Sequence, residues 1–269
     1  MDAQEYQKLL ESIRFIYGYD FTEYAESSVK RRIALFMQNR KIDTLEELGK
    51  VLFKNEHVFA EFIQELSVTV TEMFRDPSFY RSLREKVLKR LATYPVFKIW
   101  IAGCATGEEI YSIAILLQEE GLLQRSIIYA TDINPRSLQL ARQGSYSTDV
   151  MKAYEKNYRE AGGTSDFSKY YTTASGVAVL DPTLQQNVVF SVHNLAADKS
   201  FNEFQLIVCR NVLMYFNQSL QDKVTTLFYD SLCYLGMLGL GDKESLLFSG
   251  KKQCFEEFDR KEKIFMKIQ

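Results

Sequence analysis

The stretch Phe97-Lys-Ile-Trp-Ile-Ala-Gly-Cys-Ala-Thr-Gly-Glu-Glu-Ile-Tyr-Ser112 decides the fold of this chain. It contains an apolar run, then a turn that holds Gly103 and Gly107, then an acidic helix start. The glycines let the backbone approach a ligand without a side chain in the way, and the free N–H groups of the following helix point at the same place. We therefore expect a nucleotide-like ligand at this turn, although some two-glycine turns only join a strand to a helix.

Two acids narrow the kind of ligand. Glu108 and Glu109 would repel a pyrophosphate, whereas they would attract ribose hydroxyls or a cationic group. A second apolar run ends in Asp132, 25 residues past Gly107, and an acid in that position suits a ribose diol. S-adenosylmethionine has both a ribose and a cationic group. The simpler interpretation of Asp132 is a helix N-cap before Pro135.

Composition and charge limit the class of protein. With 269 residues, 46% of them hydrophobic and 25% charged, the chain has room for one large or two modest globular domains. A net charge of −2 argues against nucleic acid as the main partner. The cysteines and histidines lack metal-binding or disulfide spacing: Cys104, Cys209, Cys233, Cys254, His57 and His193. We therefore expect no bound metal. Because neither a signal peptide nor a membrane-spanning stretch is evident, we also expect a cytoplasmic protein.

The first part of the chain is predicted to be helical. Up to residue 66 the apolar positions have helical spacing, and Thr44-Leu-Glu-Glu47 fits a capping box at a helix start. Asp76 and Pro77 predict another helix start, with Asp76 as the N-cap, for a helix that runs towards Leu91.

From Val96 onward the pattern changes to short apolar runs that alternate with helical segments. This alternation favours a parallel sheet covered by helices, with strands at 97–102, 127–131, 188–193, 206–209, 246–248 and 264–268. We predict a helical N-terminal domain at 1–78 and an α/β domain at 79–269.

An insertion interrupts the α/β alternation. Residues 145–187 are too many for a plain connection in a compact domain, so they should have structure of their own. Lys169–Thr173 and Val177–Leu180 flank a turn at Ala174–Gly176 and predict a β-hairpin.

Four segments stand out in order: Thr71-Glu-Met-Phe-Arg-Asp-Pro77, Ala102-Gly-Cys-Ala-Thr-Gly-Glu-Glu-Ile-Tyr-Ser112, Ala130-Thr-Asp-Ile-Asn134 and Val208-Cys-Arg-Asn-Val-Leu-Met-Tyr-Phe216. Together they resemble the CheR family of chemoreceptor methyltransferases, nearly end to end. The resemblance implies an all-helical domain followed by a Rossmann-like S-adenosylmethionine-dependent methyltransferase domain with a small inserted β-subdomain. It also implies methyl transfer to glutamate side chains on the cytoplasmic helices of bacterial chemoreceptors, which gives a glutamate methyl ester and S-adenosylhomocysteine.

The resemblance assigns residues to the methionine end of the cofactor. Thr69, Thr71 and Arg75 would belong to the segment between the domains that reaches this end. An arginine fork pairs well with a carboxylate, so Arg75 would meet that of the cofactor. The alternative for Arg75 is a surface or helix-capping role.

The remaining cofactor residues come from the α/β domain. Gly103 belongs to the turn, Glu108 would face the amino group of the cofactor and Asp132 its ribose. Asn194 and Leu195 match a strand-end pair that lies by the adenine. A turn role for Asn194 is the alternative.

The resemblance places the reaction beside Arg210 and Asn211, which follow the strand at 206–209 on the ligand-binding edge of the sheet. Tyr215 comes four residues after Asn211, and a helical turn would bring both side chains beside the transferred methyl. Because a glutamate carboxylate is already ionised at pH 7, no general base is needed, and Arg210 or Tyr215 could orient it. The alternative is that Tyr215 and Phe216 only pack the core.

Partner recognition is expected in the helical domain. The segment Val29–Lys41 has five basic residues and no acid, and the family uses such a helix to contact the receptor. The candidates are Lys30, Arg31, Arg32 and Arg40. A solvated basic face is the alternative. In some members the β-subdomain tethers a peptide at the receptor C-terminus, and the predicted hairpin sits at the matching place.

Some positions depart from the family pattern. Thr69 stands where many members have Asn, Met73 replaces a phenylalanine and Ile110 replaces a proline. Gly241-Asp-Lys-Glu-Ser245 takes the place of a Gly-His-Ser-Glu pattern, which puts a role of that loop in doubt. Two other functions stay open, namely methylation of a different acceptor and a silent module that binds the cofactor or a receptor without turnover. We expect a monomer.

Overall fold

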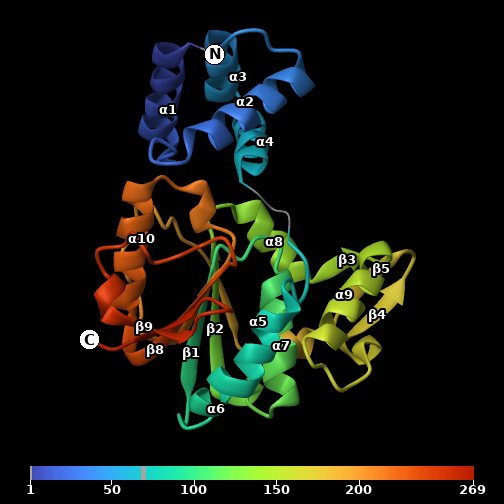
Figure 1. Cartoon of the computed structure of the whole chain (residues 1–269). Coiled ribbons are helices and arrows are strands. Elements are labelled where there is room, and N and C mark those ends of the chain that lie inside the picture. The colour runs from blue at the N-terminus through green and yellow to red at the C-terminus, as the bar shows by residue number, and fades with distance from the viewer. Residues whose placement is uncertain (1, 68–70) are drawn as a thin grey trace.

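The computed structural model describes residues 2–67 and 71–269, with an all-helical bundle beside an α/β domain (Figure 1). The bundle consists of α1 (Ala3–Tyr17), α2 (Glu26–Arg40), α3 (Leu45–Lys54) and α4 (Glu56–Leu66). It has a core of its own, in which Leu10, Ile13, Ile33, Leu48 and Phe62 are buried. The predicted helical part at the N-terminus is therefore confirmed. Within the described ranges no helix has the length and apolar character needed to span a bilayer.

The capping box is present at the start of α3. Thr44 Oγ1 accepts a hydrogen bond from the backbone N–H of Glu47 at 3.1 Å, and the Glu47 carboxylate accepts one from the backbone N–H of Asp43 at 3.3 Å. The side chains thus satisfy backbone donors that a helix start leaves without partners.

The helix after the bundle follows the predicted range but is not uniform. It comprises α5 (Pro77–Ser82), a π-helical turn (Leu83–Val87) and α6 (Leu88–Leu91). Asp76 is the N-cap residue and Pro77 the first helical residue, as predicted, but the Asp76 side chain makes no capping bond and its backbone is left-handed with φ of 56°. The carboxylate pairs with the guanidinium of Arg210 instead, at 2.6 Å.

The main sheet has seven strands in the order β6 (Val188–Val192), β2 (Ser126–Asp132), β1 (Phe97–Ala102), β7 (Phe204–Cys209), β8 (Leu232–Leu240), β10 (Ile264–Lys267) and β9 (Phe255–Asp259). The pairs from β6 to β8 are parallel, whereas β10 is antiparallel to both of its neighbours. Chain order reverses between β1 and β7, which is where open α/β sheets bind ligands.

Helices cover both faces of the sheet. The flanking helices are α7 (Glu108–Glu119), α8 (Pro135–Gln143) and α10 (Gln218–Ser231). Ile99 and Ile101 of β1 share a buried cluster with α5 to α8, while Trp100 between them packs with α10. This alternation is that of a strand buried on both faces, and it confirms the predicted α/β class.

The strand predictions hold for the runs that became β1, β2, β6, β7 and β10. The strand predicted at 246–248 is wrong: these residues lie in turns, with Leu246 buried and Leu247 and Phe248 exposed. The sequence pattern also did not predict β8 and β9. Gly236 and Gly239 weaken the strand signal of β8, and acids separate the two phenylalanines of β9.

The insertion forms a second sheet beside α9 (Thr148–Glu160). Its antiparallel strands are ordered β3 (Ser145–Ser147), β5 (Val177–Leu180) and β4 (Tyr171–Ala174). The predicted hairpin is therefore confirmed. Its turn consists of Ser175 and Gly176, both with positive φ, as a tight two-residue hairpin turn requires.

The turn after β1 depends on its glycines. Gly103 has φ of +77°, and a Cβ there would lie 2.5 Å from Cγ2 of Val212. Gly107 has φ of +99°, and a Cβ there would lie 2.9 Å from the backbone of Ala141 in α8. Neither position has room for a side chain, so the turn brings β1, α8 and the segment after β7 into direct contact.

Replacing Gly107 with Ala should lower the free energy of unfolding by about 2 kcal/mol or more, because the methyl group meets the α8 backbone and the residue prefers negative φ. Gly121→Ala is the matched control, since Gly121 has φ of +67° with open space around it. This control should cost about 1 kcal/mol. Urea unfolding of both variants measures the difference, and equal losses would contradict the packing argument.

Candidate functional site

Two neighbouring cavities lie at the carboxyl ends of β1, β2, β6 and β7. They share Gly103, Asn211, Val212 and Tyr215 in their walls. The first opens between the α/β domain and the bundle, and the second lies under the segment that leads into α5. A two-part ligand bound across both cavities would therefore have its middle beside these four shared residues.

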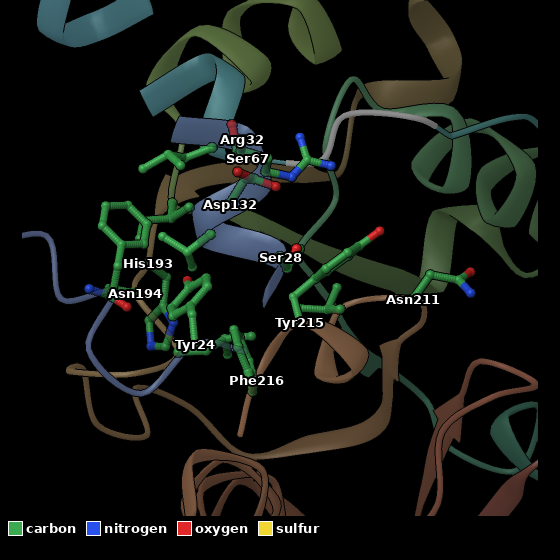
Figure 2. Close-up of a pocket in the computed structure, with 17 residues that line it drawn as sticks. Tyr24, Ser28, Arg32, Ser67, Asp132, His193, Asn194, Asn211, Tyr215 and Phe216 are labelled. Atoms are coloured by element: carbon green, nitrogen blue, oxygen red, sulfur yellow. The ribbon is translucent and has the colours of Figure 1, made fainter. Parts of the chain in front are cut away.

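Both domains line the first cavity (Figure 2). The α/β domain contributes Asp132, His193, Asn194, Leu195 and Phe216 among others, and the bundle side contributes Phe21, Tyr24, Ser28, Arg32 and Ser67. Aromatic and apolar groups alternate here with a few polar side chains, which is the usual character of a site for a nucleoside-sized ligand. The predicted residues Gly103, Asp132, Asn194, Leu195 and Asn211 are thus brought together.

Asp132 is a buried acid that holds the glycine turn. One carboxylate oxygen accepts the backbone N–H of Ala105 at 2.9 Å and the other that of Asn134 at 2.8 Å. Burial raises the pKa of Asp132, while these backbone hydrogen bonds oppose the rise. The helix N-cap of α8 is Asn134, whose side chain accepts from Arg136 and Ser137, so the simpler interpretation of Asp132 as the cap is wrong.

Asn194 has a turn role in addition to lining the cavity. Its side-chain oxygen accepts the backbone N–H of Ala196 at 3.0 Å, and its own N–H donates to Asp198 at 2.8 Å. These bonds fix the chain just beyond β6, so Asn194 and Leu195 are held at the cavity wall.

The second cavity gathers charged groups from three segments. Thr71, Glu72 and Arg75 come from the segment before α5, Glu109 from the start of α7, and Arg210 from the end of β7. The predicted pair Thr71 and Arg75 therefore lies here, next to the shared residues. Thr69 lies outside the described residues.

Arg210 is buried in a fixed network. Its guanidinium contacts Asp76 at 2.6 Å and Glu109 at 3.0 Å, and it stacks over the ring of Phe79 at 4.2 Å. Burial alone would lower the pKa of Arg210, but the carboxylates of Glu109 and Asp76 outweigh burial and raise it. Glu109 also accepts a hydrogen bond from the Tyr80 hydroxyl at 2.9 Å. The Arg210 side chain is only 3% exposed, although it lines the second cavity and its Nε has no hydrogen-bond partner among the described residues.

Glu108 and Glu109 point in different directions. Glu109 lines the second cavity, whereas Glu108 lines neither of the two cavities. The Glu108 carboxylate accepts hydrogen bonds from Thr106 at 2.7 Å and from Tyr154 of α9 at 3.4 Å, and burial raises its pKa. Sequence reasoning singled out Glu108 by its motif position, but Glu109 is the acid that faces the cavity.

The segment after β7 is not a helical turn. Asn211 has a left-handed backbone with φ of 61°, and a 3₁₀ turn (Leu213–Tyr215) follows. The prediction that a helical turn aligns Asn211 with Tyr215 is therefore wrong, although both residues line both cavities. The buried Glu244 accepts hydrogen bonds from the backbone of this segment, and its position at the end of Gly241–Glu244 was the only signal for it in the sequence.

The bundle is hydrogen-bonded to the segment that carries Tyr215. The backbone N–H of Ala25 donates to the carbonyl of Tyr215 at 2.8 Å, and that of Asn217 donates to the carbonyl of Glu23 at 2.9 Å. Between them Tyr24 packs edge-on against Phe216, with ring centroids 4.9 Å apart. Burial raises the pKa of Tyr24. Sequence reasoning missed this strand-like pairing because no periodic pattern marks it.

The basic residues of α2 divide into different environments. Arg32 lines the first cavity and donates to the Glu65 carbonyl at 2.8 Å. Lys30 pairs with Glu26 at 2.6 Å on its own helix, and Arg40 pairs with Glu61 of α4. Arg31 is exposed.

Comparison with known proteins agrees with this architecture. The model described as CheR methyltransferase, SAM binding domain, matches residues 69–264, and the CheR methyltransferase all-alpha domain matches residues 4–67. A putative methyltransferase Cher3 of Pseudomonas putida is 49% identical over 98% of this chain and 96% of its own length. A chemotaxis protein methyltransferase of Listeria innocua is 32% identical over 86% of each chain.

The chain also resembles a more distant solved structure. Magnesium protoporphyrin IX methyltransferase from Synechocystis, with bound S-adenosylmethionine, shares 13% identity and a TM-score of 0.37 over 70% of this chain and 75% of its own. The family assignment rests on the two domain matches, which together cover most of the sequence. The chain belongs to the CheR methyltransferase family, and S-adenosylmethionine is its cofactor.

Proposed function

We propose that this protein methylates glutamate side chains on the cytoplasmic helices of bacterial chemoreceptors. The observation that carries the proposal is the composition of the junction between the cavities. Gly103, Asn211, Val212 and Tyr215 line it, and none of these four residues is of a type that serves as a general base at neutral pH. A carboxylate is already ionised and needs no base, whereas a protonated amine or a hydroxyl would.

The residues present fit S-adenosylmethionine in two parts. We assign the nucleoside to the first cavity, with Asp132 at the ribose and Asn194 and Leu195 at the adenine, and the methionine part to the second, with Thr71 and Arg75. When bound, the cofactor supplies an electrophilic methyl group to the acceptor. The chain itself holds the acceptor in line, and such orientation is worth on the order of 7 to 11 kcal/mol.

Tyr215 is the better candidate for orienting the acceptor carboxylate. Arg210 was the other candidate, but its guanidinium is held by Asp76 and Glu109. We assign Arg210 to keeping the second cavity in shape, and Asn211 to contact with the cofactor. Glu108 and Thr69 remain predicted cofactor residues.

The names of the relatives support a chemoreceptor as the acceptor of the methyl group. Proteins of Listeria innocua and Salmonella typhimurium that are similar to this chain are chemotaxis protein methyltransferases. A chemoreceptor helix rich in glutamates would complement the basic side of α2, where Arg31 is exposed. Tethering of a receptor C-terminal peptide by the β-subdomain, a monomeric state and a cytoplasmic location remain part of the proposal.

The decisive experiment uses methyl-labelled S-adenosylmethionine and receptor-containing membranes from the same cell. Label on a receptor that base releases as methanol supports a glutamate methyl ester. Base-stable label would show a different acceptor. Cofactor binding without any label transfer would show a silent binding module.

Replacing Tyr215 with Phe should lower turnover at least about tenfold, because one hydrogen-bond donor is lost at the reacting groups. The affinity for S-adenosylhomocysteine should change less than about threefold. Tyr234→Phe, at a position 66% exposed, is the control. Unchanged turnover of the Tyr215 variant in the labelling assay would remove this tyrosine from the mechanism.

Replacing Arg210 with Met should lower the free energy of unfolding by about 3 to 5 kcal/mol, because it leaves the largely buried Glu109 carboxylate without its ion-pair partner and with only the Tyr80 hydroxyl bound to it. Asp76→Asn should cost much less, since the Asp76 side chain is 42% exposed. Chemical denaturation compares the two. Equal costs would argue against Arg210 as a buried structural cation.

Replacing Arg31 with Glu should raise the KM for the receptor several-fold and leave S-adenosylhomocysteine affinity unchanged. Charge reversal affects encounter with an acidic partner, and the effect should shrink with added salt. Lys8→Glu is the control, because it makes the same reversal of charge at an exposed position of α1 in the same domain. A similar effect from both variants would indicate net charge, not a specific contact.

A further inference from the structure

A buried carboxylate lies directly behind the segment that joins the two cavities. Glu244 is on the loop after β8 and is only 4% exposed. Its Oε2 accepts backbone N–H groups from Gly241 at 2.7 Å and Asn211 at 3.0 Å. Its Oε1 accepts those of Val212 at 2.8 Å and Met214 at 3.3 Å. Each oxygen therefore has two backbone donors.

The segment after β7 needs such an acceptor. The strand ends at Cys209, and Asn211 then turns through a left-handed conformation that is unfavourable for most non-glycine residues. Backbone N–H groups in this tight turn have no strand partner, and leaving them unpaired in a buried place is costly. A carboxylate forms stronger hydrogen bonds than a neutral acceptor. Glu244 thus holds the backbone from Asn211 to Met214.

Gly241 makes this contact possible. A Cβ at Gly241 would lie 2.9 Å from the backbone nitrogen of Asn211 and 2.9 Å from Oε2 of Glu244. Gly241 leaves room for Glu244 beside Asn211, so the hydrogen bonds from the segment after β7 to Glu244 depend on both residues. Gly241 and Glu244 are the first and fourth residues of Gly241-Asp-Lys-Glu244. The departures from the Gly-His-Ser-Glu pattern fall at the two residues between them, so the glycine and the acid are both retained.

We infer that Glu244 is a positioning residue for the cofactor site. Asn211 and Val212, whose N–H groups it binds, line both cavities, and Met214 precedes Tyr215 in the same 3₁₀ turn. Glu244 itself is not among the residues that line either cavity. The inference rests on the proposed assignment of Asn211 and Tyr215 to cofactor and acceptor.

Glu244→Gln is a sharp test because the two side chains have nearly the same shape. Whichever way the amide is turned, its NH2 group faces two backbone N–H donors. The variant therefore loses two hydrogen bonds and places donors against donors. The backbone at Val212 and Met214, or at Asn211 and Gly241, must then move.

The first readout is the dissociation constant of S-adenosylhomocysteine, measured by calorimetry at a temperature where each protein is folded. We expect it to rise about tenfold or more in Glu244→Gln, with a lower turnover at saturating cofactor because Tyr215 shifts. An affinity and turnover equal to those of the unchanged protein would overturn the inference. If the unchanged protein itself binds no S-adenosylhomocysteine, the proposed function fails instead.

Glu119→Gln is the matched control for the loss of a buried carboxylate. Glu119 in α7 accepts hydrogen bonds from Arg84, Tyr158 and Tyr170, and it lines neither cavity. This variant should lose thermal stability but keep its affinity for S-adenosylhomocysteine. If both variants lose affinity in proportion to stability, Glu244 has only a structural role.

Amide hydrogen exchange on the unchanged protein keeps the test independent of whether a variant folds. The N–H groups of Asn211, Val212 and Met214 should be protected although Asn211 and Val212 lie outside helices and strands and Met214 lies in the first turn of a short 3₁₀ helix. In Glu244→Asp, which keeps the charge but shortens the reach, the protection should fall. Exchange of these amides at the rate of an open loop in the unchanged protein would overturn the inference.

Discussion

The buried guanidinium of Arg210 is the contact on which the site depends. It binds Asp76 before α5 and Glu109 at the start of α7, and it extends from the end of β7. Three segments that are far apart in the sequence therefore meet at one cation. Because removing one partner from a buried ion pair leaves an uncompensated charge, each segment constrains the others. The second cavity takes its shape from this arrangement.

The fold could be predicted where burial imposes a clear period. The strands β1, β2, β6, β7 and β10 and the hairpin of the insertion follow from apolar runs and turn residues. The strand β8 could not be predicted, since its pairing with β7 and β10 compensates for glycines that disfavour a strand. The apolar run at 246–248 led to a wrong strand prediction because apolar residues also occur in turns. Of these three residues only Leu246 is buried.

The cofactor site could be predicted where a motif fixes the backbone. The glycine turn and the residues after β2, β6 and β7 converge as expected because parallel strands end at one edge. Side-chain direction was harder to infer. Glu109 rather than Glu108 faces the second cavity, and Arg32 lines the first cavity instead of facing outward. Small rotations around a helix decide which residue points inward. Glu244 acts from a loop distant in sequence, and its place at the end of Gly241–Glu244 did not indicate which backbone it binds.

The pairing of residues 23–25 with residues 215–217 has a thermodynamic consequence. The first cavity has one wall from the bundle and another from the α/β domain, so a ligand that fills it contacts both. Binding then favours the docked arrangement over any in which the domains separate, by a free energy that grows with ligand concentration. Cofactor binding therefore stabilises the contact between the bundle and the α/β domain. The stability of this contact rises with the fraction of the protein that has cofactor bound.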